Sequence, residues 1–169
     1  MRARDDSEAG RERRAAVLNE RIYLTFASLA VVLALVGHGD PTVQEALATL
    51  GITLAGTVLA VFTADVVSHV VVHEGLPTSG ELRHIVGTLV GALGGVALPF
   101  VFLGLAALGA WTTERALHAS AVALVVALVV IGWLAVRRAR ITWWQRLLVL
   151  GAEAVLGLAV VGLQLLAHG

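Results

Sequence analysis

Long apolar runs constrain this chain more than any other feature. Five segments are apolar and nearly free of charge, at residues 22–39, 46–72, 85–110, 116–136 and 146–167. A helix that crosses a bilayer needs about 20 mostly apolar residues, because the hydrocarbon core is about 30 Å thick. The runs therefore predict an all-α, polytopic membrane protein, a bundle of five transmembrane helices.

The overall composition supports the same class. Of the 169 residues, 58% are hydrophobic and 14% are charged, whereas about 25% of the residues in a soluble domain are charged. We expect residues 19–169 to form a single membrane domain and residues 1–18 to form a polar, flexible cytoplasmic tail. The chain has no cysteine, which excludes disulfides and thiolate chemistry.

The arginines predict the orientation in the membrane. All twelve basic residues are arginine, and eleven of them fall on one side of the predicted spans, with Arg115 alone on the other. Positive charge is retained on the cytoplasmic side, so we expect the N-terminus inside and, after five spans, the C-terminus outside. Arginine without lysine, in a chain rich in alanine, valine, leucine and glycine, indicates a high-GC bacterium. We therefore expect a multi-pass protein of the bacterial cytoplasmic (inner) membrane.

Several connections contain helix-start signals. Asp40-Pro41 fits an N-cap followed by proline at the first helical position, which would open the second span. Thr113 with Glu114 can cap the fourth. Capping boxes, in which a threonine is followed three residues later by a glutamate or glutamine, are expected at 78–81 and 142–145.

The third span contains a helix-packing signal. Gly87, Gly91 and Gly95 repeat every four residues and share one helix face. Small residues at this spacing let helix backbones approach closely in a membrane. We expect a contact within the chain, and the alternative is the seam of a homodimer. Pro99 removes one backbone hydrogen bond and should bend this span.

Asp65 is the main functional candidate, because a carboxylate within a membrane span is costly and is a functional-site hypothesis by default. Asp65, His69 and His73 are spaced four residues apart and share one helix face. Neighbouring members are about 6 Å apart along the axis, which suits a pair that shares a proton or a metal ion. The three together suit a relay better than a closed three-ligand site. The alternative is a purely structural role, in which Asp65 forms a hydrogen bond with Thr25, Ser28 or a backbone group.

Glu153 is the expected partner of Asp65. In the predicted topology Asp65 lies about 12 Å above His73 and Glu153 about 10 Å beyond Arg146, at similar depth in the inner leaflet. If their helices adjoin, the two carboxylates could share a proton or bracket a cation. Further candidates with a weaker signal are His73, Glu74 and His118. The identity of any metal stays open.

The second span resembles that of bacterial members of the vacuolar iron transporter family. That family has five spans and a second-helix pattern A-G-x-x-S-M-x-x-G-E-Y-x-S. Ala55-Gly56 together with 64–68 is similar when one inserted residue is allowed, with Asp65 in place of the glutamate. The proline region at 97–100 and the closing segment 140–169 are also similar. The resemblance implies divalent-cation transport through Asp65.

The chain also departs from that family. Residues 22–28 contain no acid or glycine, Ala60 and Val61 stand near the methionine position, and 74–83 is too short for the cytosolic metal-binding insertion of the larger members. A closer resemblance is to small five-span integral membrane proteins of actinobacteria, which implies no activity.

These patterns lead to a proton-linked cation transporter or channel, with a divalent metal ion as one candidate substrate. Asp65 and Glu153 would be the ion or proton carriers and His69 a relay. The rival is a non-catalytic membrane module that packs with partner helices or stabilises a membrane complex. We expect no enzyme and no cofactor, because the sequence contains no nucleophile–base pair and no complete metal motif. The bilayer is the expected partner, and nucleic acid is not, because the arginine-rich tail lacks interleaved aromatic residues.

Overall fold

The chain folds into long helices. A computed structural model describes residues 2–37, 39–138, 143–145, 148, 151 and 155, and no strand is present in that part of the chain. The helices are α1 (Arg2–Gly37), α2 (Val43–His73), α3 (Ser79–Leu93), α4 (Ala97–Ala107) and α5 (Thr113–Arg138), with a 3-10 turn, η1 (Gly94–Val96), between α3 and α4.

Four segments of these helices are long and apolar enough to cross a bilayer. They are Ala15–Gly37, Val43–His73, Ser79–Ala107 and Thr113–Ala135. These segments confirm the helices expected at 22–39, 46–72, 85–110 and 116–136. The fifth expected span, 146–167, lies almost entirely outside the described residues. Helix α1 continues back to Arg2, through the segment expected to form a polar tail, whose flexibility stays a prediction.

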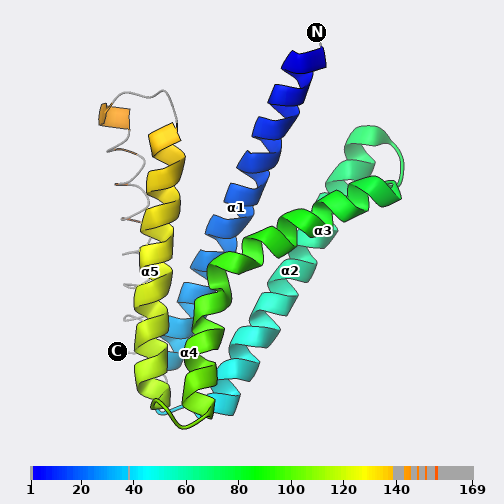
Figure 1. The fold of residues 1–169 in the computed structure, drawn as a ribbon. Coiled ribbons are helices and arrows are strands. Elements are labelled where there is room, and N and C mark those ends of the chain that lie inside the picture. Colours follow the sequence, from blue (N-terminus) through cyan, green and yellow to red (C-terminus); the bar gives the residue numbers. More distant parts are fainter. Residues whose placement is uncertain are drawn as a thin grey trace.

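The helices run alternately up and down. The start of α1, the α2–α3 connection and the end of α5 gather at one end of the molecule, and the α1–α2 and α4–α5 connections lie at the other (Figure 1). We call the first the arginine-rich end, because eleven of the twelve arginines were assigned to that side, and the second the opposite end. The alternation agrees with the sides assigned from the sequence.

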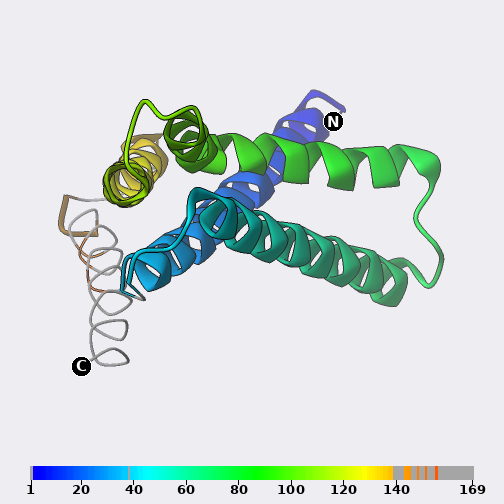
Figure 2. The same ribbon diagram turned by 90° about the horizontal axis from the view of Figure 1, so that it is seen from below.

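The core is concentrated toward the opposite end. Helix α5 packs against α1 and α4, and α1 also packs against α2 and α3. Helix α2 contributes only Ala46, Leu50 and Leu54 to the buried residues, all from its first half. Beyond Leu54, α2 leans away from α4 and α5 toward the α2–α3 connection (Figures 1 and 2). The molecule is therefore tight at the opposite end and splayed at the arginine-rich end.

The third span is bent, as predicted from Pro99. Proline has no N–H to bond the carbonyl four residues earlier, and its ring crowds that carbonyl. The α-helical pattern gives way to the 3-10 turn at Gly94–Val96 directly before Pro99. Helix α4 then runs alongside α5, whereas α3 slants away toward α2 (Figure 1). The bend thus separates the packed half of this span from its splayed half.

Of the three glycines predicted to share one face of the third span, two contact α1. A Cβ atom placed on Gly91 would lie 4.0 Å from Cγ1 of Val17, and one on Gly95 would lie 3.3 Å from Oγ1 of Thr25. The Arg21 Nε donates a hydrogen bond to the Gly91 carbonyl at 3.0 Å. The expected contact within the chain is therefore confirmed for Gly91 and Gly95. A Cβ on Gly87 would meet nothing within 4 Å, so Gly87 takes no part in that contact, and a homodimer stays a prediction.

Two of the predicted caps were wrong by one or two residues. Helix α2 is capped by Thr42 and not by Asp40: Thr42 and Glu45 form a complete capping box, which bonds more backbone groups than an aspartate cap before proline. The Thr112 hydroxyl, not Thr113, accepts from the Arg115 N–H at the start of α5. The capping box of Thr78 and Glu81 at α3 is confirmed. The box expected at 142–145 begins outside the described residues.

The α1–α3 contact predicts different outcomes for two adjacent glycines. Thr25 is fully buried and its hydroxyl donates to the Arg21 carbonyl at 2.6 Å, so it cannot easily yield to a new side chain. Gly95→Val should therefore destabilise the protein by about 1–3 kcal/mol through overpacking. Gly94→Val is the matched control, since a Cβ there meets nothing within 4 Å. Thermal unfolding in micelles measures both, and equal stability of the two variants would contradict the contact.

Candidate functional site

Polar side chains gather where the helices splay apart. Glu20 and Arg21 come from α1, Asp65, His69 and His73 from the last turns of α2, and Glu81 from the first turn of α3. We call these six residues the polar cluster.

The depth of the two deepest acids can be counted along their helices. Asp65 lies 22 residues after Val43, about 33 Å along the axis of α2, and Glu20 lies 17 residues before Gly37, about 26 Å along α1. Val43 and Gly37 both lie at the opposite end. If the hydrocarbon core, about 30 Å thick, begins near Val43 and Gly37, both carboxylates are expected close to its other boundary, at the arginine-rich end.

Glu20 of α1 and Asp65 of α2 form an electrostatically interacting pair of carboxylates. They are close enough for the charge on Asp65 to act on Glu20, and both side chains are half-buried. Two like charges in a partly desolvated position repel each other. The pair is therefore most stable when a proton or a cation offsets one of the charges.

Hydroxyl groups near this pair are engaged elsewhere. The Thr25 hydroxyl donates to the Arg21 carbonyl at 2.6 Å, and the Ser28 hydroxyl donates to the Leu24 carbonyl at 2.7 Å. Both bonds lie within α1. Neither hydroxyl therefore donates to Asp65. A hydrogen bond from Thr25 or Ser28 to Asp65 had been the simple alternative to a functional role. The Arg21 guanidinium, next to Glu20 in sequence, donates to the Gly91 carbonyl of α3.

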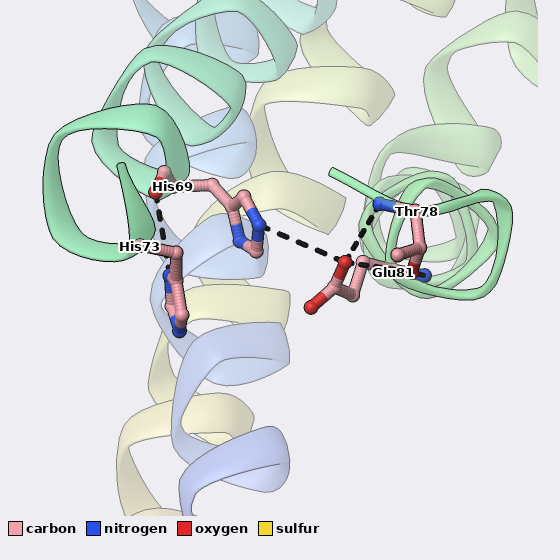
Figure 3. A network of polar contacts seen from close by, with 4 residues as sticks. All are labelled: His69, His73, Thr78 and Glu81. Carbon is pink, nitrogen blue, oxygen red and sulfur yellow. Dashed lines mark hydrogen bonds and ion pairs between the residues drawn. The ribbon is translucent and has the colours of Figure 1, made fainter. Parts of the chain in front are cut away.

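Histidines connect α2 to α3 one and two turns beyond Asp65. The His69 Nε2 lies 3.6 Å from a Glu81 carboxylate oxygen, with side-chain exposures of 15% and 45%. The His69 and His73 rings are stacked with centroids 4.3 Å apart, and the His73 Nδ1 lies 3.3 Å from the His69 carbonyl. Figure 3 shows the two rings on α2 and Glu81 reaching across from α3.

Glu81 has two roles at once. One of its carboxylate oxygens accepts from the Thr78 N–H at 2.7 Å and from the Thr78 hydroxyl at 2.6 Å. This capping box holds the carboxylate in one position, so His69 meets a fixed anion. The ion pair forms only when His69 is protonated. The α2–α3 connection is thus bridged by a charge-dependent contact.

The predicted candidates divide into three groups. Asp65, His69 and His73 belong to the polar cluster, with the two histidines adjacent as their spacing predicted. Glu153 lies outside the described residues. Glu74 is exposed and ends α2 in the left-handed conformation, with φ of 51°. His118 lies at the opposite end, with its Nδ1 2.9 Å from the Glu114 carbonyl, beside a hollow of about 390 Å³ that Asp40 and Glu114 also line.

Sequence reasoning missed Glu20 and Glu81. Glu20 precedes the first apolar run by two residues and was not considered as a candidate, although α1 runs through it without a break. The sequence did contain a signal for Glu20. Its distance from the end of the first span is similar to the distance of Asp65 from the start of the second, which predicts a similar depth for the two acids. Glu81 was recognised only as part of a capping box.

The polar cluster can bind protons and small cations. Its three carboxylates face one arginine and two titratable histidines, so it carries net negative charge when the histidines are neutral. Among the residues that the structure describes, no three histidine, cysteine, aspartate or glutamate side chains converge to hold a metal ion. A divalent cation bound between Glu20 and Asp65 would therefore retain much of its water shell, as oxygen-seeking cations such as Mg²⁺ commonly do.

Comparison with known proteins adds no relative. No protein-family model, no curated protein and no solved structure matches this chain. The functional argument therefore depends on the geometry of the polar cluster.

Comparing the two capping boxes measures how much the His69–Glu81 contact contributes to stability. Glu45→Ala removes the glutamate half of one capping box and nothing else, and should lower the stability slightly. Glu81→Ala removes the same half of the other capping box together with the contact to His69, so it should lower the stability further when His69 is protonated. Chemical unfolding in micelles measures both. In a His69→Ala background the two losses should become equal, and a difference that persists would show that His69 is not its source.

Proposed function

We propose that this protein is a proton-linked cation transporter or channel of a bacterial cytoplasmic membrane. The observation that carries the proposal is the pair of half-buried carboxylates, Glu20 and Asp65, which lie close enough for the charge of one to act on the other. An ionisable side chain in a membrane span is a functional-site hypothesis by default, because such residues mark ion pathways and proton relays. A pair without an opposing charge between its members has no evident structural benefit.

The chemistry of the pair suits exchange between a proton and a cation. When both carboxylates are ionised they repel each other, and either a proton or a cation between them removes that repulsion. The two species therefore compete for one place, and occupation by one favours release of the other. His69, one helical turn beyond Asp65 on α2, and its neighbour Glu81 on α3 supply further ionisable groups toward the arginine-rich end.

The proposed topology has five spans, with the N-terminus in the cytoplasm and the C-terminus outside. The charge asymmetry and the up-and-down order of the helices support it. In this orientation the polar cluster opens toward the cytoplasm, where it can exchange protons and ions with water. The rival function is a membrane module that packs with partner helices. A negative result in the transport assay would favour this rival.

Introduced cysteines test this topology cleanly, because the chain has none of its own. Leu76 and Leu108 are each 84% exposed and lie in connections at the two ends. In intact cells a membrane-impermeant maleimide should label Leu108→Cys and should label Leu76→Cys only after permeabilisation. His168→Cys should label from outside if five spans are present. Protection of His168→Cys in intact cells would indicate four spans.

Neutralising either carboxylate should abolish transport. The assay is the pH change inside proteoliposomes on addition of iron(II), manganese, zinc, sodium or potassium. Wild type should respond to at least one ion, and Glu20→Gln and Asp65→Asn should each fall to the level of empty liposomes, because each leaves one carboxylate that no longer requires an offsetting charge.

Asp40→Asn is the matched control, since Asp40 is an exposed acid at the opposite end. It should retain the wild-type response. Both test variants should remain folded, because each removes a repulsion and not an attraction. Folded wild type that responds to none of the ions, or test variants that match wild type, would contradict the proposal and favour the packing module.

A further inference from the structure

A second polar site lies between α1 and α3, separate from the polar cluster. Val17, Arg83, His84, Gly87 and Thr88 line an open hollow of about 250 Å³. Its floor is low because Gly87 has no side chain, and a Cβ there would meet nothing within 4 Å. The hollow lies one helical turn beyond the Gly91 contact, toward the arginine-rich end, and Val17 of α1 borders both.

The rim of this hollow is basic. Arg83 and His84 both line it and both are exposed. Among the described residues, no hydrogen bond or ion pair holds the Arg83 guanidinium. The Thr88 hydroxyl donates to the His84 carbonyl. Its oxygen keeps lone pairs that can accept a hydrogen bond from a headgroup hydroxyl. An anionic group at the rim would meet an available guanidinium and an imidazole.

The depth of the hollow matches the headgroup region of a bilayer. The span Ser79–Ala107 has 29 residues, about nine more than the hydrocarbon core requires, so its first turns extend beyond the core. Arg83 is the fifth residue of this span. One turn deeper, Val86 and Val90 are exposed and present apolar surface to the bilayer. The site thus offers positive charge at headgroup level and apolar contact just below it.

We propose that this hollow binds the headgroup of an anionic phospholipid, whose acyl chains lie along Val86 and Val90. A lipid explains both halves of the site, whereas a free phosphate would use only the basic rim. Basic pockets between transmembrane helices commonly bind anionic headgroups. The inference does not depend on the proposed transport activity, since none of its residues belongs to the polar cluster.

The test measures lipid retained by the full-length protein. Protein in a zwitterionic detergent is mixed with phosphatidylglycerol, phosphatidylcholine or inorganic phosphate, and bound molecules are counted by native mass spectrometry. Wild type should retain phosphatidylglycerol in preference to phosphatidylcholine. Arg83→Gln should weaken phosphatidylglycerol binding by about fivefold, as the loss of one basic residue near a membrane surface implies.

Two further variants separate this site from general attraction to arginine. Gly87→Leu fills the hollow without removing charge, and it should weaken phosphatidylglycerol binding as Arg83→Gln does. Arg115→Gln removes an exposed arginine at the opposite end and should bind like wild type. Thermal unfolding in the same detergent checks that each variant is folded.

Three results would overturn the proposal. The first is equal retention of the two lipids by wild type. The second is unchanged phosphatidylglycerol binding in Arg83→Gln and Gly87→Leu, which would place the lipid elsewhere. The third is displacement of phosphatidylglycerol by inorganic phosphate at equal concentration, which would indicate a free-anion site.

Discussion

The close approach of α1 and the third span determines how the other helices are placed. Gly91 and Gly95 bring the two backbones together against Val17 and Thr25, and Arg21 bonds the Gly91 carbonyl across the contact. In a bilayer such packing and hydrogen bonding supply much of the association energy, since lipid removes the hydrophobic drive between helices. Helix α2 contacts α1, α3 and α4, but all of its buried residues come from its first half, so its second half is held less closely by the other helices.

The bend before Pro99 explains why one end of the molecule is packed and the other is open. Below the bend, α4 lies along α5 and contributes Leu103 and Ala106 to the core. Above it, α3 follows α1 for one turn beyond Gly95 and then separates, which leaves a hollow at Gly87. The same divergence leaves Asp65 and His69 of α2 partly accessible. Both polar sites therefore lie where neighbouring helices diverge, and both consist of helix residues.

Sequence periodicity and length predicted the helices well, because a span is defined by its own composition. The partners of individual side chains were predicted less well, because they depend on which helices adjoin. Asp65 was recognised from its apolar surroundings, but its neighbour in the described residues is Glu20 of α1, which adjacent charges in sequence had concealed. The cap of α2 was misplaced because Asp40-Pro41 was weighed ahead of Thr42 and Glu45, whose spacing was equally visible.

The length of α2 makes the geometry of the polar cluster sensitive to the bilayer itself. Its 31 residues extend about 46 Å, well beyond a hydrocarbon core of about 30 Å, and a long helix adapts to such a mismatch by tilting. Because α2 is anchored in the core only through its first half, a change in tilt swings Asp65 relative to Glu20. A thicker membrane should bring α2 more upright, so we expect the separation of these two carboxylates to change with membrane thickness.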